Sequence, residues 1–578
     1  MLVRLASLLF FFSLAINSLN GQTISTIFET SGAKETPTYE EGIKWWQDLD
    51  KLSPRVKMMT MGPTDAGFPL HLVVISNDQD FNFTSLEKKK RIKILVNNSI
   101  HSGEPDGVDA SMLLARDIVT GKKKLPDNVV LAIIPFYNIG GALNRSLYYR
   151  ADQNGPNAYG SRGNARNFDL NRDFIKADSR NTRSFAEIFH MVDPDIFIDN
   201  HVSNGADYQH VMTLIASQHN KLGGEMGAYM NKVFEPAIYR IMADKGYDLI
   251  PYVNIFGATP DAGWSEFLDG PRYSSGYATL FNTFAFVPET HMLKPYDQRV
   301  DATLKLMESF IEFGAENGET IKKLRTAAKE ATKTKNSFPL KWVHDKSFVT
   351  EITFKGYEAT YKPSLISGQP RLYYDRSKPF VKQIPYFNKF NESKFVEKPL
   401  AYIIPQGWWT VIERLKDNKI EMRQFQSDTT ITVEVYHIEE FTASTRVVEG
   451  HHPNSNVKIR KSISPMRFRK GDYFIPMNQT GNRFLVEVLE PEGEDSYFYW
   501  NFFDPILTQK EGFSTYVFEE TALEYLQKNP DLKKQLEEKR KTDTAFAKDG
   551  RANLEFIYKN SPYYEPDYMR YPVYRVLF

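Results

Sequence analysis

Short, almost wholly apolar segments alternate with a helical pattern in the first 300 residues, and this alternation limits the fold more than any other feature. Residues 92–96 and 129–135 are rich in β-branched side chains and too short for helices, so both predict buried strands. Residues 106–119, which lie between them, repeat their apolar positions at helical spacing. Residues 195–199 and 284–287 predict two more buried strands. Strands that alternate with helices predict an α/β domain with a mostly parallel or mixed sheet.

The pattern changes after residue 313. Residues 320–335 are polar, Lys-rich and helical, which is typical of a connector. Later segments, such as 430–436 and 483–489, alternate aromatic or apolar residues with polar ones and predict strands, whereas 523–541 is again helical and highly charged. We therefore expect a signal peptide at 1–22, a catalytic domain at 36–315, a helical linker at 316–337 and a β-rich accessory region of unknown function at 338–578.

The first 22 residues have the pattern of an export signal. Arg4 precedes an uncharged apolar run over residues 5–16, and small and polar residues follow. The run is too short to span a bilayer, which needs about 20 helical residues. No later stretch approaches 18 apolar residues. We expect a protein that is exported to the periplasm or the extracellular space and has no membrane span in its mature form.

Composition excludes several classes of function. The 72 basic and 72 acidic side chains give a net charge of zero, which argues against nucleic acid as a partner. The absence of cysteine excludes disulfides, thiolate zinc sites and Cys nucleophiles. The sequence also lacks the G-x-S-x-G, phosphate-loop, G-x-G-x-x-G and H-E-x-x-H motifs. Any chemistry must therefore use oxygen and nitrogen ligands.

Two H-x-x-E pairs are candidates for metal binding, and their settings differ. His437 and Glu440 lie in a strongly alternating run, where residues three apart point to opposite faces of a strand, so we interpret this pair as part of a surface sheet. His101 and Glu104 lie in the turn HSGEPDG, directly after the predicted strand 92–96. In a turn the two side chains can face one point, and strand ends are where sites form in α/β sheets.

Further polar residues follow the other predicted strands. His201 comes directly after strand 195–199 and offers a third ligand, so that an imidazole, a carboxylate and a second imidazole would suit Zn²⁺. Glu289 follows the strand at 284–287, where a carboxylate could serve as general base. The pair Asn171–Arg172 offers an amide and a planar guanidinium suited to gripping a carboxylate. Arg162, by contrast, we expect in a solvated surface loop.

In this order, these pieces resemble the zinc carboxypeptidase family, the carboxypeptidase A/B-like metallopeptidases, as a secreted bacterial member. The resemblance covers roughly residues 39–313, including a helix at 39–52 and a hairpin ending in PLHLVVIS. It continues through ILVNNSIHSGEPDG, NFDLNRDF, DIFIDNH and FAFVPETHM. It implies an α/β fold with a mixed twisted sheet flanked by helices, to which the β-rich C-terminal region is added.

The resemblance also implies a role for each matching residue. His101, Glu104 and His201 match the ligands of one Zn²⁺ per chain. Glu289 matches the glutamate that activates water and passes its proton to the leaving amine. Arg150 matches the arginine that polarises the scissile carbonyl and stabilises the oxyanion. The grip on the substrate's terminal carboxylate corresponds to Asn171 and Arg172, and the implied partner is a peptide or protein with a free C-terminus.

Some positions depart from the family, and other functions stay open. Gly103 stands where many relatives have an arginine, and Asn200 and Pro288 are not the pancreatic-type residues. The mobile tyrosine has no clear match; Tyr273 and Tyr277 are candidates, and we favour Tyr273. The alternatives to a carboxypeptidase are a hydrolase of γ-D-Glu–diaminopimelate peptide bonds, an inactive binding protein, and a small-molecule amide or ester hydrolase. The Asn171–Arg172 pair argues against the last.

Overall fold

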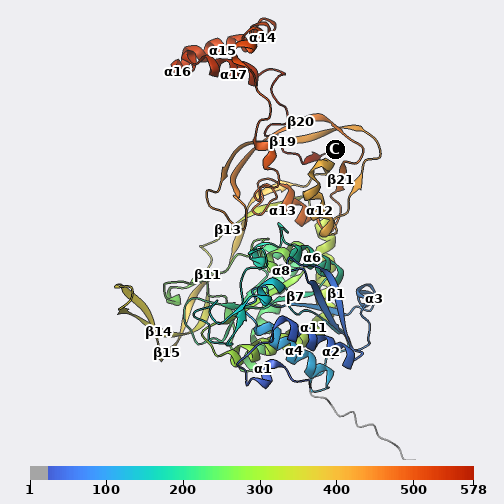
Figure 1. Ribbon diagram of the computed structural model, residues 1–578, viewed down its shortest axis with the longest axis vertical. Helices are drawn as coiled ribbons and strands as arrows, with labels where there is room; N and C mark the ends of the chain where they lie inside the picture. Colours follow the sequence, from blue (N-terminus) through green and yellow to red (C-terminus); the bar gives the residue numbers. More distant parts are fainter. Residues whose placement is uncertain (1–23, 578) are drawn as a thin grey trace, which may run out of the picture.

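The computed structural model describes residues 24–577 and contains a central mixed sheet, which confirms the predicted fold class (Figure 1). The predicted signal peptide lies outside the described residues. The sheet has nine strands in the order β1-β2-β4-β3-β7-β12-β9-β10, with β8 paired to β12. Neighbours are parallel at β4-β3-β7-β12 and antiparallel at β1-β2-β4 and β12-β9. The bounds are β1 Val56–Pro63, β2 Pro69–Ile75, β3 Ile92–Asn97, β4 Val129–Ile134, β7 Ile196–Asp199, β8 His201–Ser203, β9 Met212–Ala216, β10 Ile250–Pro251 and β12 Phe284–His291.

Helices cover both faces of this sheet. One face packs against α2 (Tyr39–Leu52), α4 (Asp106–Val119), α9 (Glu235–Asp244) and the first half of α11 (Tyr296–Thr334). The other face packs against α6 (Arg180–Val192) and α10 (Ser274–Leu280). The smaller elements are α1 Ile27–Thr30, α3 Phe83–Lys88, α5 Ile139–Leu143, β5 Arg145–Ser146, β6 Tyr159–Gly160, α7 His219–Leu222, α8 Gly224–Tyr229 and the short helical turns Leu170–Arg172, Met230–Phe234 and Pro260–Ala262.

Local sequence accounts for the helix boundaries that matter to the site. Thr38 and Glu41 form a capping box, in which each side chain accepts a hydrogen bond from the other's backbone N–H, and α2 begins after it. The Ser179 hydroxyl accepts a hydrogen bond from the N–H of Thr182 and so caps α6. All six side chains of β3 are buried, as its apolar sequence predicts. Because β3 and β7 are parallel and pair Asn97 with Asp199, the segments that follow them meet at one edge of the sheet.

The predicted helical linker at 316–337 is helical as far as Thr334, where it forms the second half of the unbroken helix α11. Ile321 is fully buried, and Arg325 is 3% exposed. The Arg325 guanidinium donates to the Asp195 carboxylate at 2.7 Å, which ties the second half of α11 to the start of β7. The lysines of this segment therefore lie on the solvent-exposed face of a packed helix, and the apolar residues among them form its buried face. The segment is not a free connector.

The C-terminal region is β-rich but shares a core with the first domain. Phe197 of β7 and Phe185 of α6 belong to the same buried cluster as Tyr402, Ile475 and Trp500. A six-stranded sheet carries this region, with the strands β17 Ala401–Ile404, β18 Arg423–Gln424, β19 Thr429–Ala443, β20 Asn454–Phe468, β21 Tyr473–Pro476 and β22 Tyr574–Val576. Two smaller sheets are also present: one contains β11 Trp264–Ser265, β15 Pro370–Phe387 and β14 Thr350–Pro363, and the other pairs β13 Ser337–His344 with β16 Phe390–Glu397. The long β14–β15 hairpin extends away from the body of the molecule (Figure 1).

Helices in this region correct one sequence prediction. Residues 483–489, predicted as a strand, belong to helix α13 (Asn482–Leu489), and six of their seven side chains are buried, which suits a helix packed on several sides. The segment 523–541 is helical as predicted but divides at Pro530 into α14 (Thr515–Lys528) and α15 (Pro530–Thr542). With α16 (Thr544–Lys548) and α17 (Gly550–Lys559), these helices form a small bundle beyond the six-stranded sheet (Figure 1). The remaining elements are α12 Trp409–Asp417 and the turns Gln406–Trp408 and Asp504–Leu507.

Candidate metal centre and substrate cavity

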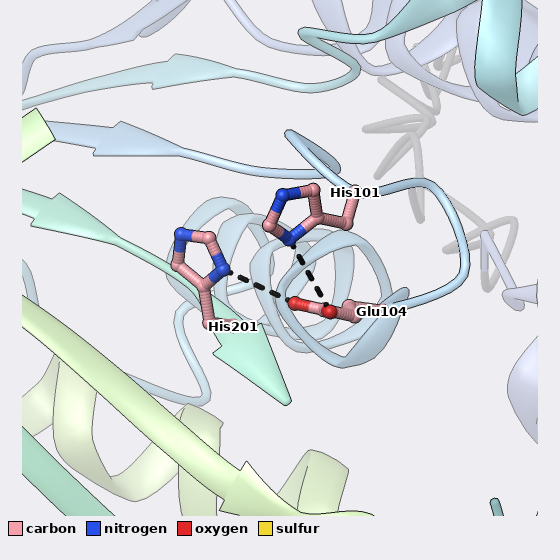
Figure 2. Close-up of side chains that lie close together, drawn as sticks. All are labelled: His101, Glu104 and His201. Carbon is pink, nitrogen blue, oxygen red and sulfur yellow. Dashed lines mark hydrogen bonds and ion pairs between the residues drawn. The ribbon is translucent and has the colours of Figure 1, made fainter. Parts of the chain in front are cut away.

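Three of the predicted residues converge at the edge of the sheet where β3 and β7 end (Figure 2). His101 lies in the turn after β3, Glu104 precedes α4, and His201 begins β8. His101 Nδ1 lies 3.3 Å from Glu104 Oε1, and His201 Nδ1 lies 3.1 Å from Glu104 Oε2. One ligand atom from each residue lies within 4.8 Å of the others, and this is the one such group of three among residues 24–577. The second H-x-x-E pair, at His437, lies within β19 as predicted.

The opposite edge of each imidazole is held by a carboxylate. His101 Nε2 lies 2.9 Å from Asp169 Oδ1, and His201 Nε2 lies 3.0 Å from Asp199 Oδ2. A carboxylate that accepts from one ring nitrogen leaves the other nitrogen free to bind a cation. The buried His101 Nδ1 has no hydrogen-bond partner. Two imidazoles backed in this way and one carboxylate fit a zinc ion with an open coordination position.

The electrostatics favour a cation at the same point. Burial alone would raise the pKa of Glu104, but the charges of His101 and Arg150 hold that pKa well below its usual value, so the carboxyl is ionised. Burial would likewise lower the pKa of His201, yet the Asp199 carboxylate raises it well above its usual value. Because a metal ion must displace the proton from His201, zinc affinity is expected to weaken as the pH falls.

Glu289 faces this cluster from the neighbouring strand. β12 and β8 are parallel and place Glu289 directly opposite His201. Burial and the charge of Glu104 raise the pKa of Glu289 to about 7, although His201 acts to lower it. His291, two residues along, is fully buried, and its Nε2 lies 2.9 Å from the carbonyl oxygen of Ala206. Residues 289 and 291 would share a face of a regular strand, so strand geometry alone does not show which of them faces the cavity. The contacts do: Glu289 lines the cavity and His291 does not.

All eight predicted site residues line one cavity of 570 Å³. Arg150 donates to Glu104 Oε1 at 2.7 Å and to the carbonyl oxygen of Val202 at 3.1 Å. The Arg172 guanidinium lies 4.5 Å from the ring centre of Tyr273, which orients it. The Asn171 amide lines the same wall, and its buried Oδ1 has no hydrogen-bond partner. Rotation about χ2 exchanges the amide oxygen and nitrogen, so this side chain can also donate. The cavity thus holds the Arg172 guanidinium and the Asn171 amide together with the His–Glu–His cluster.

Sequence reasoning missed four residues of this site. Asp169 and Asp199 support the histidines, and neither has a motif of its own. Arg162 was predicted in a solvated loop; this was incomplete, because its half-exposed side chain lines the cavity and its Nη2 lies 2.9 Å from Asp169 Oδ2. Tyr252, from the loop after β10, also lines the cavity. Only the aspartates had a signal, because they lie in the same NFDLNRDF and DIFIDNH segments as the predicted residues.

The C-terminal region contacts the site's support. The Asp169 N–H donates to Glu449 Oε2 at 2.8 Å, and His451 Nε2 lies 2.7 Å from Asp178 Oδ2. Asp495 accepts from Arg272, the residue before Tyr273, at 2.8 Å. The segment that carries Asp169 and the segment that carries Tyr273 are therefore both held in part by side chains from beyond residue 440.

A family model described as zinc carboxypeptidase matches residues 43–231. Carboxypeptidase 2 of Trichophyton rubrum is 22% identical over 431 residues, which cover 71% of this chain and 73% of the relative. Carboxypeptidase 2 of Trichophyton tonsurans is 21% identical and covers 72% and 75%. Among solved structures, a metallo-carboxypeptidase from Pseudomonas aeruginosa is 15% identical with a TM-score of 0.37 and covers 49% of this chain and 69% of its own. Carboxypeptidase A from Helicoverpa armigera is 16% identical with a TM-score of 0.36 and covers 51% of this chain and 75% of its own.

The cluster has the donors of a catalytic metal site, and the comparisons make the class of protein more specific. Residues 43–231 match the zinc carboxypeptidase model, and together with the carboxypeptidase relatives this match supports a zinc metallocarboxypeptidase. The matched segment contains six of the eight predicted site residues, whereas Tyr273 and Glu289 lie beyond it. The curated relatives described above are fungal, so they lend no support to the expected bacterial origin. Every helix within residues 24–577 is too short or too polar to cross a bilayer.

Proposed function

We propose that the protein removes single residues from the free C-termini of peptides or proteins, with one zinc ion held by His101, Glu104 and His201. The observation that carries this proposal is the shared cavity, which both the His–Glu–His cluster and the Asn171–Arg172 pair line. Only the last residue of a chain has a carboxylate one residue beyond the bond to be cut. A site that holds both groups at once therefore selects an exopeptidase reaction.

Each side chain then has a defined task. A zinc ion in this cluster supplies Lewis acidity toward oxygen. Glu289 accepts the proton of the attacking water and passes it to the leaving nitrogen, a role suited to a carboxyl whose pKa is about 7. Arg150 lies beside Glu104 and donates toward the oxygen of the scissile carbonyl as negative charge develops there. Tyr273 orients the Arg172 guanidinium for the terminal carboxylate.

We also propose that the protein is exported and that its substrates are peptides with free C-termini. The N-terminal pattern supports export to the periplasm or the extracellular space. The test measures release of the C-terminal residue from a library of acetylated dipeptides. The reaction is followed without chelator, with chelator, and after zinc is restored. A γ-D-Glu–diaminopimelate peptide belongs in the same assay, because preferential cleavage of it would support the alternative hydrolase. No release from any substrate by zinc-loaded protein would instead support the inactive binding protein.

A further inference from the structure

A second cavity adjoins the substrate cavity at Arg150. It has a volume of 680 Å³ and shares Tyr149, Arg150 and Arg162 with the first cavity. Neither Asn171 nor Arg172 contributes to its wall. The two cavities therefore meet at three shared side chains, and the pair that would hold the terminal carboxylate lines only the first cavity. A peptide anchored at Arg172 with its scissile carbonyl near Arg150 has this second cavity within reach of its preceding residues.

Gly103 lets Arg150 pack closely at the junction of the two cavities. A Cβ atom at position 103 would lie 2.7 Å from Arg150 Cδ and 3.0 Å from the carbonyl oxygen of Gly160. The second contact is with backbone, which cannot move aside as a flexible side chain can. Any larger residue would therefore displace Arg150 or the β5–β6 turn. Glycine at this position thus fixes the place of Arg150, a side chain that lines both cavities.

The wall of the second cavity is cationic. Arg150, Arg162 and Arg166 line it, together with asparagines and small residues, and no described residue of the wall is acidic. Arg150 and Arg162 are paired with Glu104 and Asp169, which lie behind them. Arg166 is exposed and has no described carboxylate within 4.0 Å; its Nη1 donates to the carbonyl oxygen of Asp178 at 3.0 Å. Its guanidinium also lies 4.7 Å from the ring centre of Phe168, which holds it over the cavity wall.

We propose that this second cavity binds acidic side chains of the substrate, two or three residues before the scissile bond, through Arg166 and the outer edge of Arg162. The proposal rests on the carboxypeptidase function proposed above and names the substrates that the enzyme prefers. Carboxylates suit the site because a guanidinium donates two parallel hydrogen bonds to them.

The test compares acetylated tetrapeptides that share one C-terminal dipeptide and carry Glu, Gln or Lys at either preceding position. Exposed arginine–carboxylate pairs each contribute about two- to fivefold, so two arginines predict a kcat/KM for the best Glu peptide about 4- to 25-fold above its Gln counterpart. The Lys peptide should be the poorest. Raising the salt concentration should reduce the preference, because these pairs are solvent-exposed.

Arg166→Gln isolates the cavity's contribution, because Arg166 touches none of the proposed catalytic residues. It should reduce the Glu-to-Gln ratio at least twofold and leave kcat/KM for the Gln peptide unchanged. The matched control is Arg180→Gln, an exposed arginine at the start of α6 that lines neither cavity, and the ratio should not change in that variant. Equal cleavage of Glu, Gln and Lys peptides at both positions would overturn this inference and leave the carboxypeptidase function intact. No cleavage of any peptide would overturn both.

Discussion

Asp169 offers the sharpest test of the metal centre, because the effect of Asp169→Asn follows from hydrogen-bond chemistry. Asp169 Oδ1 accepts from the N–H of Asn171 at 2.9 Å and lies 2.9 Å from His101 Nε2. Its Oδ2 accepts from Arg162 Nε at 3.0 Å and lies 2.9 Å from Nη2. Both oxygens therefore face donors, and guanidinium and backbone N–H groups can only donate. An asparagine has a single oxygen, so one set of donors must face its NH₂ group whichever way the amide is turned.

Each orientation of this asparagine removes an acceptor from a different set of donors, and in both a neutral amide replaces the carboxylate that supports His101. With the oxygen toward Arg162, the NH₂ group opposes the Asn171 N–H and drives the His101 proton onto Nδ1, the atom proposed to bind zinc. With the oxygen toward His101, the Arg162 fork loses its acceptor. Loss of a ligand's supporting carboxylate typically lowers metal affinity about 10- to 100-fold, which corresponds to about 1.4–2.7 kcal/mol. The unpaired donors should also lower the free energy of unfolding of the metal-free protein by about 1–3 kcal/mol.

The assay is competition for zinc between the metal-free protein and a chromophoric chelator. The matched control is Asp152→Asn, which makes the same charge change in the same cavity at an exposed residue. Its zinc Kd should stay within about twofold of the wild type, because Coulomb interactions across solvent are weak. A zinc Kd for Asp169→Asn that equals the control's would refute the reasoning, because His101 would then not depend on this carboxylate.

Four further variants test the general base, the carboxylate grip and the pH dependence of stability. Glu289→Gln should lower kcat by about 10²- to 10⁴-fold with zinc content retained, as expected for general-base loss; His291→Gln should lower stability more than kcat, because His291 is buried away from the cavity. Arg172→Ala should abolish most activity on free C-termini while leaving the slow turnover of amidated peptides unchanged. In α13, burial and the charge of Asp495 raise the pKa of Glu487 to about 8. Because this folded pKa lies above the unfolded value, Glu487 stabilises the fold below about pH 4.5 and loses that contribution as the pH rises toward 8. Glu487→Gln should remove this loss in chemical denaturation measured from pH 5 to 8.

Sequence reasoning worked where one local pattern determined one structure. The helix at 39–52 and the helix at 106–119 have the bounds of α2 and α4, and the predicted strand at 92–96 is β3 without its last residue. The predicted ligands were identifiable because they directly follow two such strands. The family match then covers the segment that holds all three.

The failures arose where distant residues decide the outcome. The apolar positions of residues 483–489 fit both the strand and the helix periodicity, and burial on several sides favours the helix. The pairing of Arg162 with Asp169 depends on the path of a loop, and the contact from Glu449 crosses 280 residues. No pattern within one segment contains that information. Tyr252 is a similar case, because only the folded loop brings it to the cavity.

The most direct test of the central claim is mass spectrometry of one peptide, synthesised with a free and with an amidated C-terminus, after incubation with the zinc-loaded protein. The account predicts that the free peptide loses residues one at a time from its C-terminus. It predicts that the amidated peptide stays largely intact, and that a chelator stops the reaction until zinc is restored. Cleavage at internal bonds, or equal loss from both peptides, would contradict it.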